Sequence, residues 1–579
     1  MGRWSVGSIP ATETKEQQGY IRQCKCNLDI ILSTAQVNKY YMAVNILIFT
    51  GMASDIWFRP IGAYRIATEL RNQGYTVQVV DLFPLIVNHK RGLFKKIIET
   101  FVGPETLWVG FSSTFFYSLQ KMKEAPGKGD GKRQLETQSG LPEDEDLPEL
   151  RQTIMDRNPN CKLVMGGGKA PMRGTNIIDI YVEGYADTSV IKMTKYLEGK
   201  NPFFQFRKNE DNSISVVDDP KASHFDFVNS STVWHPSDHI FPGEALPIEI
   251  SRGCIFNCSF CAYPLNGKKK LDYMRDTGLL REEFQRNYDL YGTTEYVFMD
   301  DTHNDSVDKL EQLYDEVYSR LKFKVRFTTY LRLDLLAAKP HSIDLLHASG
   351  LRGAFFGIES LNYQSSKTIG KGLRPERAVE TLHKVREVWG NDVATGVSFI
   401  VGLPHDTEET VNKWLTQATD VNFPNDSITI FPLYMPYVAN DRRLWKSDIE
   451  SNPEKYGYSY PAPLQYPGLW ENKITGLNAK RAQEIAEHYL AAATKNNKKK
   501  PSHFIIPGLL NLGYKYEDII LGVGVNPPVL DDLGKDHNSR TAPMMAEQHQ
   551  RRVKYNTEYI NKVLYSGVYS NLHTPNKPL

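Results

Sequence analysis

The sequence predicts an α/β protein that begins with an open, doubly wound parallel sheet and continues as a partial α/β barrel with a mostly helical carboxyl-terminal region. Strand-like apolar runs alternate with amphipathic helical patterns over residues 42–200 and again over 243–438. A linker-like stretch, 201–242, separates the two, and residues 439–579 lack the alternation. With 579 residues the chain is also too long for one hydrophobic core, so several domains are expected.

The charge balance gives no reason to expect a polyanionic partner. The chain has 69 lysines and arginines against 68 aspartates and glutamates, a formal net charge of +1, so nucleic acid is not indicated. No apolar run reaches the length of a membrane span, and the start of the sequence has no apolar signal-peptide core. Six cysteines are too few for a disulfide framework, which favours a reducing compartment, the cytoplasm.

Residues 1–41 differ from the sequence that follows them. They show no apolar periodicity, and the first strand-like run begins only after a second methionine, Met42. We expect this stretch to be a disordered tail or a spurious extension upstream of a start at Met42. Cys24 and Cys26 therefore receive no functional weight.

The first unit has five strand-like runs separated by turns and helical patterns. In chain order they read VNILIFT, TVQVVDLF, TLWVGFSST, CKLVMGGG and DIYVEGYAD. The first is continuously apolar, as expected for a strand buried on both faces, and the helical pattern after it ends at Gly74. This order predicts a Rossmann-like sheet with helices on both faces. A stretch at about 121–150, rich in glycine, proline and charge, is expected to be a solvated insertion.

The second unit has six strand-like runs, most of them separated by helical patterns such as VDKLEQLYDEVYSRL and PERAVETLHKVREVW. The runs read ALPIEISRG, TEYVFMDD, VRFTTYLRL, RGAFFGIES, ATGVSFIVGLP and SITIFPLYMP. Repeated βα units of this length build a curved parallel sheet, here a partial (β/α)6 barrel, with its chemistry at the carboxyl ends of the strands. In the region that follows, AKRAQEIAEHYLAAA predicts a helix, and the role of this region is unknown.

Half of the cysteines fall within eight residues, directly after the first strand of the predicted barrel. Cys254, Cys258 and Cys261 have the spacing Cys-x3-Cys-x2-Cys. A structural zinc site wants four closed ligands, but no cysteine follows Cys261, and disulfides would leave one thiol over. Iron–sulfur clusters are held by cysteine thiolates, and three thiolates leave one iron open to another molecule. The triplet therefore favours a cluster, with zinc and plain core cysteines as the alternatives.

The stretch CIFNCSFC, with an aromatic residue before its third cysteine, resembles the signature of the radical S-adenosylmethionine (SAM) superfamily. Four later stretches resemble, in order and spacing, successive strand ends of that family's partial barrel: YVFMDDTHND, TTYLRLDLL, DLLHASGLRGAFFGIESLNYQSSKTIGKG and FIVGLPHDTEET. The resemblance covers Pro247 to Tyr437. It implies that the three cysteines ligate a 4Fe–4S cluster whose open iron binds the amino and carboxylate groups of SAM. An external one-electron reductant would then drive cleavage of SAM to methionine and a 5′-deoxyadenosyl radical.

The same resemblance implies polar residues that bind the methionine part of SAM. Asp300 and Asp301 stand where the family commonly has Gly-Gly-Glu facing the methionine ammonium, which is a departure from the pattern. Arg332 ends a predicted strand and could face a carboxylate, or it could make a surface salt bridge.

The remaining expected contacts to SAM follow from the later strand ends. Glu359 and Ser360 stand where family members hold the ribose or the polar methionine groups, although Glu359 could instead interact with a helix dipole. Phe260, Ile400 and Gly402 would line the adenine slot, where a glycine allows close approach of the backbone.

The first unit, from Val44 to Lys200, resembles the cobalamin-binding domain of the class B radical SAM enzymes. The stretches that carry this resemblance are RPIGAYRIATELRNQGYTVQVVDL, VGFSST, VMGGGKAP and IYVEGYAD. In open α/β sheets ligands bind at the carboxyl ends of the strands, where small residues let a nucleotide-like tail come close. The residues expected to bind cobalamin there are Ser112, Ser113, Gly166, Gly167 and Gly168. The three glycines could also form no more than a tight turn.

One departure from the cobalamin pattern concerns the loop SDIWFRPIG. Domains that bind cobalt through histidine carry Asp-x-His-x-x-Gly there, whereas this chain has Trp57 and no histidine nearby. Either cobalamin binds without a protein histidine on cobalt, or the domain has lost the cofactor. Trp57 could cover the lower face of the corrin or belong to the core.

Taken together, the resemblances predict a radical SAM enzyme, with cobalamin-dependent methylation of an unactivated carbon as the main hypothesis. The first alternative keeps the radical but not the methyl transfer, and catalyses cyclisation, rearrangement or oxidation. The second is a non-catalytic iron–sulfur or zinc-binding protein. The substrate, a small molecule or a peptide, is not readable, because one fold serves many reactions.

Overall fold

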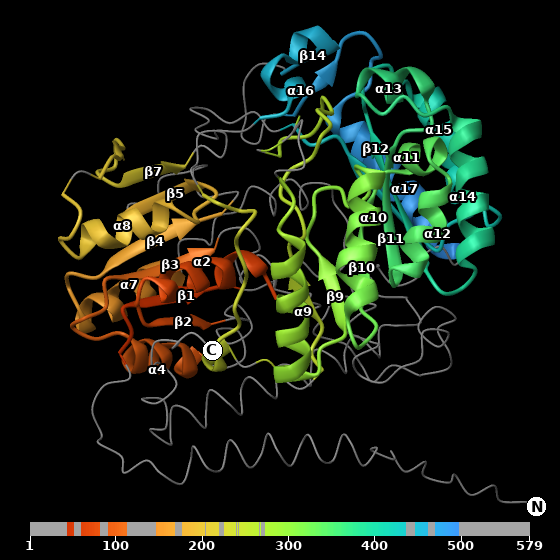
Figure 1. Ribbon diagram of the computed structural model, residues 1–579. Helices are drawn as coiled ribbons and strands as arrows, with labels where there is room; N and C mark the ends of the chain where they lie inside the picture. Colours follow the sequence, from red (N-terminus) through yellow and green to blue (C-terminus); the bar gives the residue numbers. More distant parts are fainter. Residues whose placement is uncertain are drawn as a thin grey trace, which may run out of the picture.

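Two sheets with mainly parallel strands and their helices lie side by side, and a smaller carboxyl-terminal part adjoins the second sheet (Figure 1). The structure is a computed structural model. It describes residues 43–50, 59–80, 91–112, 146–167, 177–202, 204–218, 225–238, 240, 243–263, 265, 267, 273–435, 446–460 and 469–496. The expectations for residues 1–41 lie outside these ranges.

The first sheet contains all five predicted strands, in the order β2-β1-β3-β4-β5. Their bounds are β1 Ile46–Phe49, β2 Val77–Val80, β3 Trp108–Ser112, β4 Lys162–Gly166 and β5 Ile180–Gly184. Neighbouring strands in this set are parallel, and Ile46 of β1 lies opposite both Val77 and Trp108. The order reverses direction at β1, and in open α/β sheets ligands bind beyond the carboxyl ends of the strands at such a point.

Helices cover both faces of the first sheet, as a doubly wound fold requires. Their bounds are α2 Ile61–Asn72, α4 Arg91–Phe101, α7 Asp146–Arg157 and α8 Ser189–Leu197. Ile46 and Ile48 of β1 join the core formed with α2 and α8, whereas Leu47 and Phe49 join the core formed with α4 and α7. The alternation of side chains along one strand thus supplies two separate cores.

Two boundaries differ from the sequence-based expectation. The predicted linker, 201–242, contains β6 (Arg207–Lys208) and β7 (Ile214–Asp218), and β7 pairs in parallel with β5. Pairing with β7 covers the edge of β5, whose backbone groups would otherwise be unpaired. Helix α7 also begins inside the predicted insertion, 121–150, of which residues 121–145 lie outside the described ranges.

The second sheet is a six-stranded, all-parallel curved sheet in the order β13-β12-β11-β10-β9-β8, which confirms the partial barrel. Its strands are β8 Leu246–Ile248, β9 Glu295–Phe298, β10 Arg326–Leu331, β11 Leu351–Glu359, β12 Ala394–Val401 and β13 Ser427–Pro432. The helices between them are α9 Thr277–Tyr291, α10 Val307–Glu316, α11 Leu333–Ala338, α12 His341–Ala348, α13 Tyr363–Thr368, α14 Pro375–Trp389 and α15 Glu408–Thr419. Side-chain caps fix four of these helix starts: Asp276 caps α9, Ser306 caps α10, Asn362 caps α13 and Thr407 caps α15.

The described part of the carboxyl-terminal region packs against the far end of the barrel. Its elements are α16 Asp448–Ser451, the short 3-10 helix η5 Pro453–Tyr456, β14 Tyr458–Ser459, β15 Glu471–Asn472 and α17 Ala479–Lys495. The predicted helix is present as α17, which lies against β13 and α15. Trp470 is buried and donates a hydrogen bond from Nε1 to the Leu433 carbonyl oxygen at 2.8 Å. Throughout the described ranges we find no helix with the length and apolarity needed to cross a membrane.

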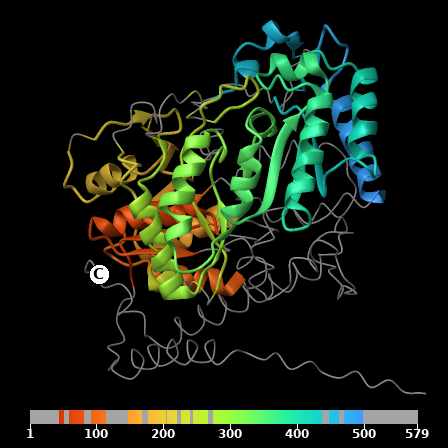
Figure 2. The same ribbon diagram turned by 45° about the vertical axis from the view of Figure 1, so that its right-hand side comes forward.

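The two sheets are joined by buried ion pairs along α2. Arg59, just before α2, pairs with Glu244, whose Oε1 lies 2.7 Å from Nε of the arginine. At the other end of α2, Arg71 binds both carboxylate oxygens of Asp238 at 2.7 and 2.8 Å, in the short helix η2 (Pro236–Asp238). In both views α9 stands at the border between the two sheets (Figures 1 and 2). These polar contacts, together with an apolar cluster that runs from β1 and α2 through Trp234 to the barrel strands, hold the two units in one arrangement.

Gly350 provides a test of the barrel's packing. It has φ +102° at the start of β11, and a Cβ there would collide with the backbone carbonyl oxygen of Val325. We expect Gly350→Ala to lower the melting temperature clearly. The new Cβ would overpack against Val325, at a cost of ~1–3 kcal/mol, and would strain the left-handed backbone, at a cost of ~1–2 kcal/mol. Gly199→Ala, also at positive φ but with open space around it, is the control and should lose only the strain term. Equal melting temperatures for the two variants, measured by thermal unfolding, would contradict this account.

Candidate functional site

The three clustered cysteines lie on the loop that leaves the carboxyl end of β8. Cys254 and Cys258 are each 8% exposed, Cys261 is partly exposed, and none of the three is in a disulfide. The loop is tied back on itself, since the Cys254 N–H donates to the Leu265 carbonyl oxygen at 3.1 Å and the Cys261 N–H to that of Cys258 at 3.0 Å. Burial raises the pKa of the Cys254 thiol, although hydrogen bonds with Thr302 and from the Phe256 N–H act in the opposite direction.

Asp300, at the end of β9, anchors the start of this loop. Its Oδ1 accepts hydrogen bonds from the backbone N–H groups of Ile250 and Ser251 at 2.9 and 3.0 Å, and its Oδ2 lies 3.0 Å from His303 Nδ1. Burial alone would raise the pKa of Asp300, but the charge of Lys309 and the hydrogen bond with His303 hold it at about 2. With both oxygens engaged inside the protein, Asp300 supports the cysteine loop, whereas the sequence suggested a direct contact with SAM.

Asp301 is the member of the acidic pair that is partly exposed. Its Oδ2 accepts a hydrogen bond from the Gly253 N–H at 3.0 Å, next to Cys254. Burial and the neighbouring charge of Asp300 raise the pKa of Asp301 to about 6. Of the two aspartates, Asp301 is therefore the one suited to meet a cationic group at the barrel mouth.

Lys309 is a part of the site that the sequence did not predict. It is fully buried in the first turn of α10, and its Nζ donates to Ser251 Oγ at 2.8 Å and to Asp305 Oδ1 at 3.1 Å. The ammonium also lies 3.6 Å from Asp300 Oδ2. No pattern in the sequence could have revealed this residue, because lysines on amphipathic helices are nearly always exposed.

Arg332 follows β10, as predicted, but it is buried and engaged within the protein. Nε and Nη2 bind both carboxylate oxygens of Asp334 at 3.0 and 2.7 Å, and Nη1 donates to the sulfur of Cys258 at 3.2 Å. The guanidinium carbon lies 3.7 Å from the ring centre of Phe256, a stacked cation–π contact. Of the two sequence-based options, a carboxylate partner or a surface salt bridge, the structure shows a buried pair with Asp334 next to a clustered cysteine.

Glu359 and Ser360 are both buried at the end of β11. Glu359 has φ +70°, which is unfavourable for a residue with a side chain and is typical of functional sites. Burial raises the pKa of Glu359, and the ammonium of Lys371, 3.7 Å from its Oε1, opposes that shift. Ser360 Oγ accepts a hydrogen bond from the Asn362 N–H at 3.0 Å and so shapes the turn after the strand.

The residues expected to line an adenine slot lie around the end of β12 and in the cysteine loop. Ile400 and Phe260 are partly buried and pack against the barrel core. Gly402 has φ +94°, and a Cβ there would come within 2.5 Å of Trp470. The space left by the missing side chain of Gly402 is thus filled by the indole of Trp470, which belongs to the carboxyl-terminal region.

At the first sheet, Ser112 and Gly166 pair directly across β3 and β4, and Gly167 follows with φ +107°. These three residues therefore share the carboxyl edge, as predicted from the sequence. Trp57, Ser113 and Gly168 lie outside the described residues.

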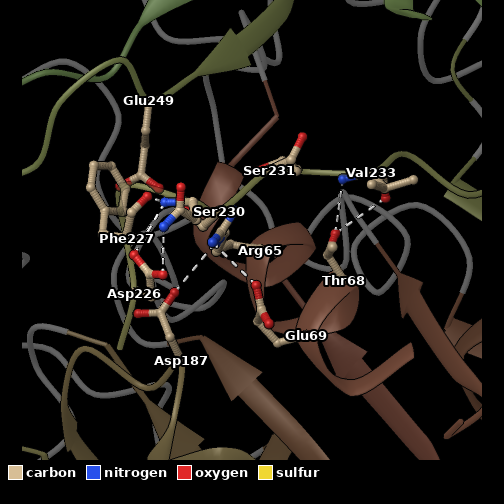
Figure 3. Close-up of polar contacts among 12 residues, drawn as sticks. Arg65, Thr68, Glu69, Asp187, Asp226, Phe227, Ser230, Ser231, Val233 and Glu249 are labelled. Carbon is tan, nitrogen blue, oxygen red and sulfur yellow. Dashed lines mark hydrogen bonds and ion pairs between the residues drawn. The ribbon is translucent and has the colours of Figure 1, made fainter. Parts of the chain in front are cut away.

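The carboxyl edges of the two sheets meet at Arg252, which lies between β8 and Cys254. Its Nη1 is 2.7 Å from Oδ2 of Asp187, in the loop after β5, and its Nη2 is 2.9 Å from Oε2 of Glu249. Asp187 also lies 3.4 Å from Arg65 of α2, which in turn pairs with Glu69 at 3.1 Å (Figure 3). The cysteine loop of the barrel thus contacts the ligand-binding edge of the first sheet.

The donor set at the barrel mouth fits a 4Fe–4S cluster. Three cysteines outside any disulfide, two of them buried, stand on one loop, and an arginine N–H and a backbone N–H point at two of the sulfurs. Hydrogen bonds of this kind stabilise sulfur ligands of clusters. Among the described residues, no three His, Cys, Asp or Glu side chains converge as a site for a single metal ion. The ligands of a cluster bind different irons, so they need not converge in that way.

Comparison with known proteins identifies the barrel. The sequence model of the Radical SAM superfamily matches residues 248–418. These residues form a radical SAM domain.

Two curated relatives match part of the chain. An uncharacterized methyltransferase of Pyrococcus horikoshii is 27% identical over 205 residues, which is 35% of this chain and 41% of the relative. An anaerobic magnesium-protoporphyrin IX monomethyl ester cyclase of Cereibacter sphaeroides is 23% identical over 292 residues, 47% of each chain. The chain thus spans less than half the length of these relatives.

Solved structures resemble the chain more fully. The radical SAM methyltransferase TsrM of Kitasatospora setae, with cobalamin and a 4Fe–4S cluster bound, has a TM-score of 0.53 at 15% identity, covering 88% of this chain and all 100% of that one. The cobalamin-dependent radical SAM enzyme OxsB has a TM-score of 0.50 at 12% identity, covering 91% and 82%. At such identities the likeness shows the fold: a doubly wound sheet followed by a radical SAM barrel.

Asp406, just after β12, generates a pH prediction. It is completely buried, accepts hydrogen bonds from Ser365 Oγ at 2.8 Å and the Leu403 N–H at 3.1 Å, and burial raises its pKa to about 7 from an ordinary 3.8. Between pH ~4 and about 7 the folded protein therefore keeps a proton on Asp406 that the unfolded chain has released. The folding stability that comes from this proton is lost as the pH rises through about 7. We therefore expect the melting temperature of Asp406→Asn minus that of wild type to be larger at pH 8 than at pH 5.5.

The matched control for Asp406→Asn is Asp344→Asn, at an exposed position of α12. Its difference from wild type should be the same at both pH values. The account of Asp406 fails if its variant behaves like the control.

Proposed function

We propose that this protein is a radical SAM enzyme in which Cys254, Cys258 and Cys261 hold a 4Fe–4S cluster. The support is the radical SAM domain itself and the three cysteines, none of them in a disulfide, at the carboxyl ends of its strands. When bound, such a cluster supplies the electron that cleaves SAM reductively to methionine and a 5′-deoxyadenosyl radical. The electron would come from an external one-electron reductant.

In this proposal the chain's own residues hold and orient SAM. Asp301 would accept a hydrogen bond from the methionine ammonium, and Glu359 and Ser360 would meet the polar groups of the methionine or ribose. Phe260 and Ile400 would flank the adenine. The adjoining indole of Trp470 would help to exclude water from that side, which protects a reactive radical from side reactions.

We further propose that the first sheet binds cobalamin and that the reaction is methylation of an unactivated carbon. One observation carries this proposal: the carboxyl edges of the two sheets meet at the Asp187–Arg252 ion pair. Ligands of open α/β sheets and of α/β barrels both bind at carboxyl edges, so two cofactors bound in this way would face each other. Ser112, Gly166 and Gly167, together with Trp57, Ser113 and Gly168, would contact the cobalamin. The similar fold of TsrM, a methyltransferase with cobalamin bound, agrees with this proposal.

A second candidate is cyclisation, rearrangement or oxidation without methyl transfer. It is favoured by the similarity to the magnesium-protoporphyrin ester cyclase of Cereibacter sphaeroides. Formation of S-adenosylhomocysteine beside 5′-deoxyadenosine would favour methylation over this candidate. The substrate, a small molecule or a peptide, is unassigned, and nucleic acid is not indicated. The cytoplasm remains part of the proposal because cluster thiols need a reducing compartment.

Iron loading is the first test. Anaerobic reconstitution with iron, sulfide and cobalamin should give about four irons per chain, with a visible spectrum typical of a cluster. Cys258→Ala should lose the cluster, because it removes one of three protein ligands. Cys161→Ala, at a buried free cysteine of the first unit, is the control and should load iron normally. Zinc in place of iron would refute the proposed enzyme, whereas a cluster without cobalamin would refute only the methyl-transfer part.

Arg332 should tune the cluster held by Cys258. Its charge and its N–H at 3.2 Å from that sulfur favour the reduced cluster, which carries one more negative charge. We expect Arg332→Gln to lower the equilibrium constant for reduction about tenfold, equivalent to 59 mV for one electron. A redox titration followed by electron paramagnetic resonance measures this shift, with the exposed Arg377→Gln as control. The same midpoint in both variants would show that Arg332 has no such effect.

A further inference from the structure

Arg252, in the described part of the cysteine loop, has a side chain that reaches the loop after β5 of the first sheet. Its side chain is only 9% exposed, and all three of its nitrogens are engaged. Nη1 binds Asp187 at 2.7 Å, while Nε and Nη2 bind the two oxygens of Glu249 at 3.2 and 2.9 Å. One guanidinium thus joins a carboxylate of the first unit to a carboxylate of the barrel.

Aromatic rings hold the guanidinium of Arg252 in place. The ring centres of Tyr185 and Phe227 each lie 4.6 Å from its carbon, and that of Phe225 lies at 5.8 Å. Tyr185 belongs to the loop after β5, whereas the two phenylalanines belong to the segment between the sheets. The contacts of Arg252 therefore come from three separate parts of the chain.

The carboxylate partner of Arg252 is itself fixed. Asp187 lies three residues past the end of β5, is 4% exposed, and also contacts Arg65 of α2 (Figure 3). The same helix is held to the segment before the barrel, because Thr68 Oγ1 and the backbone N–H and carbonyl of Val233 exchange hydrogen bonds at 3.1 and 3.2 Å (Figure 3). Asp187 is thus a fixed point on the carboxyl edge of the first sheet.

The ion pair between Arg252 and Asp187 is better suited to positioning the two units than to stabilising their contact. Buried ion pairs add little net stability compared with apolar packing, because both charges must be taken out of water. An arginine fork, in contrast, accepts carboxylates only in a narrow geometry. Arg252 also lies two residues before Cys254, so any displacement of Asp187 would be passed directly to the cysteine loop.

We propose that Arg252 and Asp187 are positioning residues that set the separation between the first sheet's carboxyl edge and the cluster. This inference rests on the proposed function, because it concerns the distance between the proposed cobalamin and cluster sites. Methyl transfer needs both sites in one geometry, whereas reductive cleavage of SAM needs only the cluster site. Loss of the ion pair should therefore depress methyl transfer more than reductive cleavage.

The direct test is a distance measurement in the loaded enzyme. Pulsed electron paramagnetic resonance between the reduced cluster and cob(II)alamin reports their separation. We expect one narrow distance distribution in wild type and a shifted or broader one in Asp187→Asn and Arg252→Lys. Arg151→Lys is the matched control, because it alters another arginine–aspartate pair with two contacts, to Asp179, that lies wholly inside the first unit. It should keep the wild-type distribution even where it lowers stability.

A second readout uses the products of SAM in the same samples, with titanium(III) citrate as reductant and no substrate. S-adenosylhomocysteine remains when the sulfonium methyl has been transferred to cob(I)alamin, which titanium(III) citrate would form from the bound cobalamin, whereas methionine and 5′-deoxyadenosine remain after one-electron reductive cleavage. We expect the ratio of S-adenosylhomocysteine to 5′-deoxyadenosine to fall by on the order of 10²-fold in Asp187→Asn, as for a small misplacement of reacting groups. The ratio should not change in Arg151→Lys.

The outcomes separate this inference from the proposed function. A wild-type enzyme with no cobalamin signal overturns the proposed methyl transfer and this inference with it. A wild-type enzyme with both signals, and an unchanged distance and product ratio in Asp187→Asn, overturns the inference alone. If Arg252→Lys does not fold, Asp187→Asn still decides, because Arg252 then keeps its pair with Glu249.

Discussion

The buried carboxylate of Asp300 is the interaction on which the site depends most. It closes the start of the cysteine loop through the Ile250 and Ser251 N–H groups and is balanced by His303 and Lys309. Removing one partner of such a buried charge network costs about 3–5 kcal/mol, because the other charge is left unpaired. The loop that carries the cysteines is therefore not a free surface loop. It is fixed to the ends of two neighbouring strands, β8 and β9.

Parallel topology explains why the remaining site residues gather where they do. In a parallel sheet all carboxyl ends lie at one edge, so Asp301, Arg332, Glu359 and Gly402 come together although they follow four different strands. The same rule brings Ser112 and Gly166 together at the edge of the first sheet. The one additional constraint is the relative placement of the two edges, which no strand pairing determines. Side-chain contacts between the units set it.

The sequence was sufficient for the five strands predicted in the first unit, for the six of the barrel and for the loop that bears the cysteines, because apolar period and thiol spacing are local signals. It was not sufficient for the partners of polar side chains. Asp300 and Asp301 are adjacent and chemically identical, yet one is buried against Lys309 and the other is partly exposed beside Gly253. Arg332 was expected to face a carboxylate or solvent, and it meets Asp334 and a cysteine. Strand β7 was missed because its short run, ISVVD, lies within a polar segment.

The charged contacts between the two units have a clear role if the carboxyl edges of the two sheets form one shared site. An apolar interface would hold two domains together but would tolerate small sliding, since dispersion and hydrophobic contacts have little directionality. The pairs of Arg59 with Glu244, Arg71 with Asp238 and Arg252 with Asp187 are directional, and they are spread along both ends of α2 and the loop after β5. Three such pairs at separate points remove rotation as well as translation. A protein that must hold two cofactor-binding edges at a fixed separation during a reaction needs directional contacts of this kind. Their desolvation cost is acceptable because the adjoining hydrophobic cores supply the folding stability.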